Sequence, residues 1–282
     1  MVHSNTNKGL VTHINAGIQK AKGKYIARMD ADDVSLPLRF QKQYDFLENN
    51  PQIGVCGAWV QGLGRYTNVA ELPVTDAEIK LQMLLDCPIC QPVVMLRKEI
   101  LEKHQLTYSQ ALVPSEDYDL WQRMSAVTKF HNLPEVLLYY RHHQENISIK
   151  IRDLAQENQV ITSNINYLKW VFPSSKLAET DFEILVSLLH RKLPYEHQNI
   201  DKVAKIIKIL LNKSPKNKQS LNENFSLPQV AQLLKKRFFE YCTTSTHFGL
   251  IVWLKYIKSG LYSQSLRLNY RFLVKAIIKY SR

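Results

Sequence analysis

Three carboxylates stand within four positions of the chain, at Asp30, Asp32 and Asp33. They directly follow a mostly apolar segment, residues 25–29, that predicts a short buried strand. Carboxylates packed this closely repel one another unless a cation neutralises them, and Mg²⁺ or Mn²⁺ takes oxygen ligands that substrate phosphates often complete. The cluster therefore indicates a divalent-cation site for a nucleoside diphosphate. An aspartate-rich loop that caps the helix expected from Pro37 is equally consistent with it.

A second acidic pair, Glu116 and Asp117, follows Ser115 where a helix is predicted to begin. Serine followed by acidic residues is a common helix cap and complements the helix dipole, so capping is favoured for this pair in isolation. A third cluster, residues 140–143, ends a predicted strand with two histidines. A histidine in that position is usually structural, although histidine is also a common metal ligand.

The elements expected around these clusters are those of an α/β protein. A helix followed by a strand that ends in carboxylates is typical of a parallel α/β sheet, where ligands bind beyond the carboxyl ends of the strands. Beyond about residue 150 the pattern becomes helical, which places a boundary near 148–152 between domains 1–150 and 151–282. The predicted strands are 25–29, 53–60, 92–96 and 135–141, and the predicted helices are 8–21, 37–49, 75–84, 116–124, 153–171, 180–190, 201–211 and 227–241.

The order and spacing of the three clusters closely resemble those of the family 2 glycosyltransferases. The resemblance covers about residues 7–150, and four motifs in order make it specific. Its motifs are Asn15-Ala16-Gly17-Ile18 with Gly23-Lys24-Tyr25 through Asp33 and Pro37-Leu38-Arg39-Phe40, then Cys87 through Arg97, then Ser115-Glu116-Asp117-Tyr118-Asp119-Leu120-Trp121, and last Tyr140-Arg141-His142-His143 through Ser148.

The resemblance implies a GT-A (Rossmann-like) core and an inverting transfer of a hexose from a nucleotide-diphosphate sugar to a glycan or lipid-linked acceptor. Bacterial surface polysaccharide assembly is the process it suggests. Mn²⁺ or Mg²⁺ is the implied cofactor. By position, the implied roles are general base for Asp117, orientation of that base for Glu116, donor binding for Asp30, Asp33, Arg28 and Arg39, metal binding for Asp32 and His143, and acceptor contacts for Gln91 and Trp121.

Two departures from the family pattern bear on these expectations. Gln91 stands where the family often has a histidine. The strands with which the family begins, including a turn that grips the nucleotide base, are expected to be missing before residue 7. The core is therefore expected to lack its first strands. An inactive fragment that serves at most as a membrane-surface or partner-binding module is the alternative from another functional class.

Composition excludes several other classes of protein. Apolar residues make up 45% and charged residues 22% of the 282, which is ordinary for a globular protein. The four cysteines are too few and scattered for a disulfide scaffold, and the pair Cys87 and Cys90 lacks a second pair that would complete a zinc site. Neither a signal peptide nor a membrane span is visible, so we expect a cytoplasmic chain.

The net charge of +12 is concentrated in the last third of the chain. Residues 201–282 hold 16 basic and 3 acidic side chains, a balance of +13, which leaves −1 for residues 1–200. The cations at 267, 271, 275 and 279 recur at helical spacing beside apolar residues, a pattern typical of an interfacial helix on anionic lipid. The sequence thus predicts that residues 250–282 bind an anionic membrane surface. The alternative is a helix that packs in the fold and exposes its basic face to solvent. No motif suggests a nucleic-acid partner.

Overall fold

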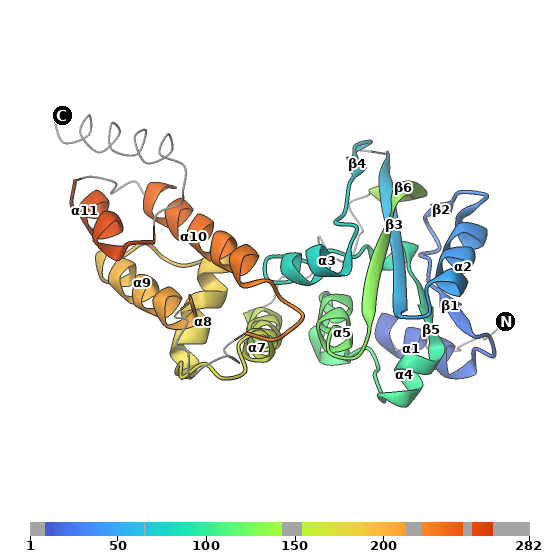
Figure 1. Ribbon diagram of the computed structural model, residues 1–282. Helices are drawn as coiled ribbons and strands as arrows, with labels where there is room; N and C mark the ends of the chain where they lie inside the picture. Colours follow the sequence, from blue (N-terminus) through green and yellow to red (C-terminus); the bar gives the residue numbers. More distant parts are fainter. Residues whose placement is uncertain (1–8, 65, 143–153, 212–220, 245–249, 262–282) are drawn as a thin grey trace. The chain divides into compact units, whose positions relative to one another are not determined.

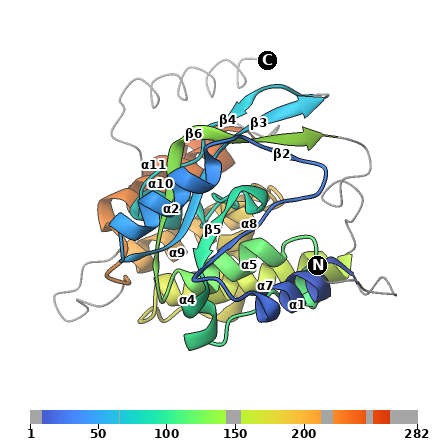
Figure 2. The same cartoon turned by 90° about the vertical axis from the view of Figure 1, so that its right-hand side faces the viewer.

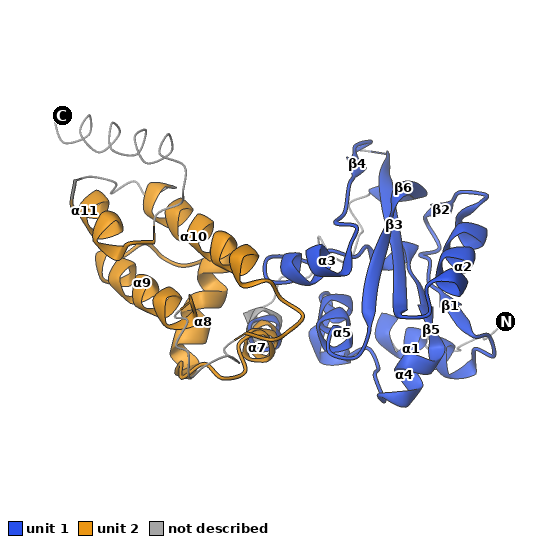
Figure 3. Cartoon of the chain, in the orientation of Figure 1, with its two compact units in different colours: residues 1–163 blue, residues 164–282 orange. Residues whose placement is uncertain are grey.

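The computed structural model describes residues 9–64, 66–142, 154–211, 221–244 and 250–261. The chain divides into two compact units, residues 1–163 and residues 164–282 (Figure 3). The predicted boundary near 148–152 lies outside the described residues. The division at residue 163 falls within a helix, α7, that begins directly after the undescribed segment.

Unit 1 is a mixed α/β unit built on a curled sheet. Its strands are β1 (Tyr25–Ala27), β2 (Val34–Ser35), β3 (Ile53–Gly64), β4 (Val69–Ala70), β5 (Met95–Arg97) and β6 (Lys129–His142). Its helices are α1 (Leu10–Lys20), α2 (Arg39–Asn49), α3 (Asp76–Gln82), α4 (Lys98–Lys103) and α5 (Glu116–Met124), with 3-10 turns η1 (Gln91–Val93) and η2 (Gln110–Leu112).

The strands follow the order β1-β5-β3-β6-β2, with β4 beside β3. The long strands β3 and β6 run parallel at the centre, whereas β1 pairs antiparallel with β5, and β2 antiparallel with β6 (Figures 1 and 2). The expectation of a parallel unit around the first strand is therefore wrong, and the sheet is mixed. The alternating faces of a strand do not reveal the direction of its partner.

Helices cover both sides of the two central strands. α2 lies on one side of β3 and β6, and α3 lies on the other (Figure 1). Leu47 of α2 packs on Ile53, Cys56 and Met95 to form one part of the core. A second cluster centres on β3 and β6, which supply Ala58, Val60, Leu137 and Leu138 together with Val93. These two clusters hold together the strands whose ends border the candidate site.

Unit 2 is helical, as predicted. It contains the end of α7 (Leu154–Val171), then α8 (Glu179–Leu189), α9 (His197–Leu211), α10 (Leu227–Thr244) and α11 (Leu250–Ser259). α9 packs against α8, α10 and α11 through buried aliphatic side chains that include Val203 and Ile207. None of the helices in the described part of the chain is long and apolar enough to cross a membrane.

Candidate active site

The aspartate cluster lies in the turn that joins β1 to β2. The turn begins where the Arg28 backbone N–H donates to the carbonyl of Val94, the residue before β5, at 3.0 Å. It ends at Asp33, whose carboxylate Oδ1 accepts the Arg141 backbone N–H of β6 at 2.8 Å. The turn is thus tied at both ends to the sheet, and the carboxylates stand at its edge.

The aspartates do not cap a helix. α2 begins after Leu38, and no side chain bonds its N-terminal amides. Asp33 is instead buried, and its second carboxylate oxygen has no hydrogen-bond partner in the described residues. Burial raises the pKa of Asp33, with further increases from Asp30 and Asp32 against the lowering effect of the Arg141 amide. A buried carboxylate with one unused oxygen is consistent with a ligand site rather than with the capping alternative.

Asp30 and Asp32 have different partners. The Asp30 carboxylate pairs with the Arg28 guanidinium at 2.5 Å. The Asp32 side chain is exposed, and its backbone carbonyl accepts from the Arg141 guanidinium at 2.7 Å. Of the three aspartates, Asp32 is therefore the most accessible to solvent, where the resemblance places the metal ligand.

Arg39 lies beneath the turn and not on its surface. Its side chain is fully buried and donates to the backbone carbonyls of Arg28 at 2.5 Å and Val94 at 3.3 Å, and to Gln43 at 3.1 Å. Burial lowers the pKa of Arg39 to about 10. The expectation that Arg39 contacts the donor is corrected by this burial: its guanidinium holds the carbonyl at the start of the turn, so we assign it a positioning role.

The second acidic pair opens α5, as predicted. Ser115 occupies the N-cap position but makes no capping hydrogen bond with its side chain, so the favoured capping interpretation is not realised by that serine. Glu116 is buried, and its Oε2 has no hydrogen-bond partner in the described residues. Burial raises the pKa of Glu116, while Arg28 lowers it and Asp30 raises it.

Asp117 has the most strongly perturbed acid group of the site. Burial raises its pKa from 3.8 to about 7, and the neighbouring Glu116 adds to the increase. The Tyr118 backbone N–H, which donates to Asp117 at 2.7 Å, and the positive charge of Arg28 act in the opposite direction. A carboxyl group that titrates near neutrality can take up a proton at physiological pH, which is the property a general base needs.

The two acidic clusters are brought into electrostatic reach of each other. Arg28 lowers the pKa values of Asp33, Glu116 and Asp117, so its charge acts on both clusters. Cys90 responds to both as well: burial raises its pKa to about 12, and Asp117 and Asp33 contribute to that increase. Residues separated by more than eighty positions in the chain therefore share one site, with Arg28 as the cation between them.

Gln91 is one of the two residues expected to contact the acceptor. Gln91 is buried in η1 and lies close enough to Tyr108 to lower the pKa of its hydroxyl, against the increase that burial causes. Tyr108 is held by Asn15, which both donates to its carbonyl at 2.9 Å and accepts from its amide at 3.0 Å. No periodicity or motif marked Tyr108, because it lies in the loop between α4 and α5.

Trp121 does not fit a role in contacting the acceptor. Its side chain is fully buried, and its ring meets the Tyr108 ring edge-on with centroids 6.3 Å apart. The expectation of an acceptor contact is corrected accordingly: a tryptophan at this place on α5 faces the interior and supports the loop that carries Tyr108. His143, the expected second metal ligand, lies outside the described residues.

The thiols of Cys87 and Cys90 are free. The Cys87 thiol donates to Asp117 Oδ2 at 3.9 Å, and burial raises the pKa of Cys87 well above its ordinary value. A protonated thiol is a weak donor and not a metal ligand. The pair therefore forms part of the apolar surroundings that raise the pKa of Asp117.

The carboxylates of the turn fit a cation that is shared with a substrate and not one enclosed by protein. In the part of the chain that the structure describes, no three His, Cys, Asp or Glu side chains are arranged to hold a metal ion. The exposed Asp32 and the unused oxygen of Asp33 nevertheless offer oxygen ligands at consecutive positions of the turn. Mg²⁺ commonly binds through one or two carboxylates together with substrate phosphates and water.

Comparison with known proteins agrees with this geometry. Residues 1–104 match the family Glycosyl transferase family 2. An uncharacterized glycosyltransferase of Methanocaldococcus jannaschii is 34% identical over 145 residues, which cover 50% of this chain and 49% of that protein. The O-antigen biosynthesis glycosyltransferase WbnJ of Escherichia coli is 34% identical over 138 residues, 47% of this chain and 53% of that protein. The chain thus spans about half the length of these relatives.

A solved structure extends the similarity to the fold. The structure of S. aureus TarS residues 1–349 in complex with UDP-GlcNAc aligns with 95% of this chain and 72% of that one, at a TM-score of 0.51 and 11% sequence identity. At that identity the likeness concerns the fold alone. Residues 1–104 are therefore similar to glycosyl transferase family 2, and the fold is of the GT-A type, like that of TarS.

Proposed function

We propose that unit 1 transfers a hexose from a nucleotide-diphosphate sugar to a hydroxyl group of a glycan or lipid-linked acceptor, with inversion at the anomeric carbon. The observation that supports this most directly is the Asp117 carboxyl, whose pKa of about 7 makes it a base at neutral pH. UDP-GlcNAc in the TarS complex supports a nucleotide-sugar donor. The role of WbnJ in O-antigen biosynthesis supports a part in polysaccharide assembly.

In the proposed reaction the ionised Asp117 takes the proton of the acceptor hydroxyl. The oxygen forms a bond to the anomeric carbon as the bond from that carbon to the diphosphate oxygen breaks, and the electron pair leaves with the nucleoside diphosphate. One displacement with one base inverts the configuration. Glu116, buried beside Asp117, raises the pKa of the base and holds its position at the start of α5.

On the donor side, the aspartate turn holds the nucleotide sugar in our proposal. Asp30 and Asp33 would bond the sugars of the donor, and Arg28, which pairs with Asp30 at 2.5 Å, would bind a phosphate. Mn²⁺ or Mg²⁺, bound by Asp32 with the diphosphate, would offset the negative charge that develops on the leaving group. His143 remains a proposed ligand of the same ion.

The test is nucleotide release by the full chain from a panel of nucleotide sugars, with and without Mn²⁺ and a glycan acceptor. Asp117→Asn should lower turnover at least ~100-fold, the typical contribution of a general base, and leave UDP binding by calorimetry unchanged. Asp45→Asn, an exposed aspartate of α2, is the matched control and should leave both unchanged. Near-normal turnover of Asp117→Asn would mean that another group is the base.

A second candidate function, a module that binds a membrane surface, is favoured by one observation. The outward face of α11 is apolar: Ile251, Leu254 and Ile257 are 62%, 52% and 39% exposed, while Val252 and Tyr256 on the opposite face are fully buried. The basic balance of +13 over residues 201–282 complements an anionic bilayer.

We propose that this face holds the chain peripherally on the inner side of the membrane, in the cytoplasm. The cations at 267, 271, 275 and 279, which lie outside the described residues, would add to the attraction. Ile251→Ser with Leu254→Ser should abolish cosedimentation with anionic vesicles at low salt. Equal binding of the wild type to neutral and anionic vesicles, or none to either, would refute this role. A chain that binds vesicles but neither binds nor turns over nucleotide sugars would favour the membrane module over the enzyme.

A further inference from the structure

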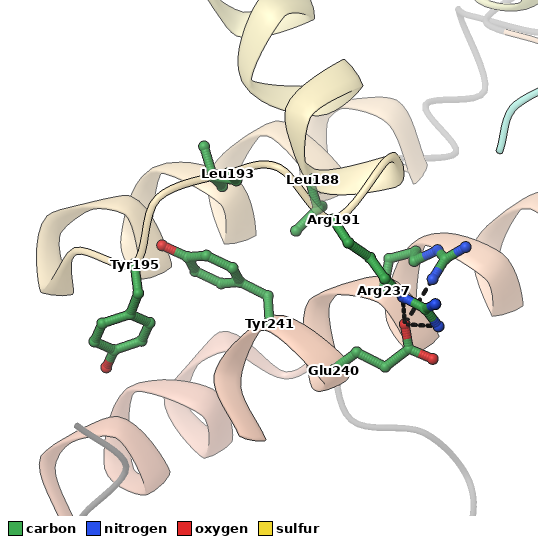
Figure 4. A pocket seen from close by; sticks show the side chains of 7 residues that line it. All are labelled: Leu188, Arg191, Leu193, Tyr195, Arg237, Glu240 and Tyr241. Atoms are coloured by element: carbon green, nitrogen blue, oxygen red, sulfur yellow. Dashed lines mark hydrogen bonds and ion pairs between the residues drawn. The ribbon is translucent and has the colours of Figure 1, made fainter. Parts of the chain in front are cut away.

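A pocket of about 590 Å³ lies within unit 2, between the end of α8, the loop that follows it and α10 (Figure 4). We propose that this pocket binds an anionic saccharide, with the sugar ring against two tyrosines and a carboxylate or phosphate group on two arginines. The inference that the ligand is a saccharide rests on the proposed function, whereas the inference that it carries an anionic group rests on the residues of the pocket alone. All of its lining residues belong to unit 2: Leu188, Arg191, Leu193, Tyr195, Arg237, Glu240 and Tyr241.

One wall of the pocket is aromatic and rigid. The rings of Tyr195 and Tyr241 lie 5.6 Å apart with their planes inclined at 37°. The Tyr241 hydroxyl donates to the Pro194 carbonyl at 3.0 Å and accepts the Glu196 amide at 3.2 Å, which fixes its ring against the loop. Tyrosine offers an apolar face and a polar tip at low entropic cost, a combination that suits the apolar C–H face and the hydroxyls of a sugar.

The other wall carries an excess of positive charge. Glu240 Oε2 accepts from Arg191 at 3.1 and 3.2 Å and from Arg237 at 2.8 Å (Figure 4). Burial alone would raise the pKa of Glu240, but the hydrogen bonds from Arg237 and Arg191 lower it, so the glutamate is ionised. Two arginines and one glutamate leave a balance of +1.

The arginines also retain donors for a ligand. The Nε of Arg237 is buried and has no hydrogen-bond partner within the described residues. A guanidinium has five N–H donors in a planar fork, which matches the geometry of a carboxylate or phosphate. A single anionic group can therefore bond to both arginines while Glu240 keeps them aligned.

The backbone at Arg191 is an unusual place for an arginine. It has a φ of 58°, in the left-handed region where α8 ends, and a glycine is favoured there because it lacks a Cβ atom. The turn is closed by the Lys192 amide, which donates to Ser187 at 2.8 Å. A strained residue that persists at the rim of a pocket is an indication of function, because glycine would satisfy the turn with less strain.

The test measures binding of digalacturonic acid, galactose 1-phosphate and neutral galactose to the full chain by saturation-transfer NMR. Binding of either anionic sugar, with galactose at least about tenfold weaker, supports the proposal, and the two anions distinguish a carboxylate ligand from a phosphate ligand. Arg191→Gly should weaken the anionic sugar about tenfold without lowering the melting temperature, since it also relieves the left-handed backbone. Lys192→Gln, the neighbouring exposed cation that does not line the pocket, should leave the affinity within about twofold.

Tyr195→Ser should weaken all three sugars, whereas UDP binding to unit 1 should be unchanged in every variant. Equal affinities for galactose and its anionic relatives, unchanged affinity of Arg191→Gly, displacement by UDP, or no binding at millimolar concentration would each overturn the proposal. None of these readouts requires turnover, so a failure of the transferase proposal at Asp117 is distinguishable from a failure here.

Discussion

Replacing Asp117 with asparagine should make the protein more stable at alkaline pH while it slows the reaction. The carboxyl has its pKa raised from 3.8 to about 7, chiefly by burial, so the folded state binds a proton that the unfolded state has released between these two values. Stability therefore falls as pH rises through this window. A pKa raised by this much corresponds to a cost of about 4 kcal/mol once the group is ionised in both states. From pH 5 to pH 8 the decrease amounts to roughly 2 to 3 kcal/mol.

The assay is urea unfolding of the wild type and Asp117→Asn at a series of pH values, because the difference between them removes the titration of all other groups. The variant should gain roughly 2 to 3 kcal/mol relative to the wild type between pH 5 and pH 8. In parallel, the wild-type rate should rise with pH up to about 7 and then level off, as the base becomes ionised. A stability difference that does not change with pH would show that Asp117 titrates normally and would refute the burial argument.

Four further substitutions in unit 1 test buried hydrogen bonds, helix capping and close packing by urea unfolding. Arg39→Met should lower the free energy of unfolding by about 2–4 kcal/mol, because it leaves buried backbone carbonyls without a donor. Arg39→Lys should lower it less. An equal loss in the two variants would mean that the planar guanidinium, and not the positive charge, is needed. Thr75→Ala should cost about 1 kcal/mol by breaking the reciprocal capping box with Glu78, and an unchanged midpoint would contradict this. Gly57→Ala should cost about 1–3 kcal/mol, since the added carbon would meet the buried Asn132 amide, and a neutral effect would mean that β6 yields easily.

The elements that could be predicted from the sequence are those whose pattern lies within a few neighbouring residues. The helix over 116–124 was predicted with the limits that α5 has, because its apolar spacing and acidic first turn act within a few residues. The helix predicted over 75–84 also begins at a local signal, because Thr75 and Glu78 form a capping box at the start of α3. The turn of aspartates was expected after a buried strand and lies between β1 and β2.

Burial across the sheet was not predictable in the same way. Arg39 was expected to contact the donor from the start of a helix, yet it reaches two carbonyls, one of them Val94, fifty-five positions away. Trp121 was expected to face a substrate, but its place on α5 points it toward Tyr108. Both errors arise because a side chain's environment depends on segments distant in sequence, which periodicity does not describe. The antiparallel partner of β1 was missed for the same reason.

The charge balance of the site explains why donor, cation and base should act together. Four carboxyl groups from two clusters interact with the charge of Arg28: Asp30, Asp33, Glu116 and Asp117. The pKa values of the last three are raised because burial disfavours their ionised forms. A diphosphate that arrived alone would add negative charge to this site and raise the pKa of Asp117 further, so the base would remain protonated at neutral pH. A divalent cation that accompanies the diphosphate offsets this increase. We therefore expect the same positive charge that favours departure of the diphosphate to keep Asp117 ionised, which makes a donor without its cation a poor substrate on two separate grounds.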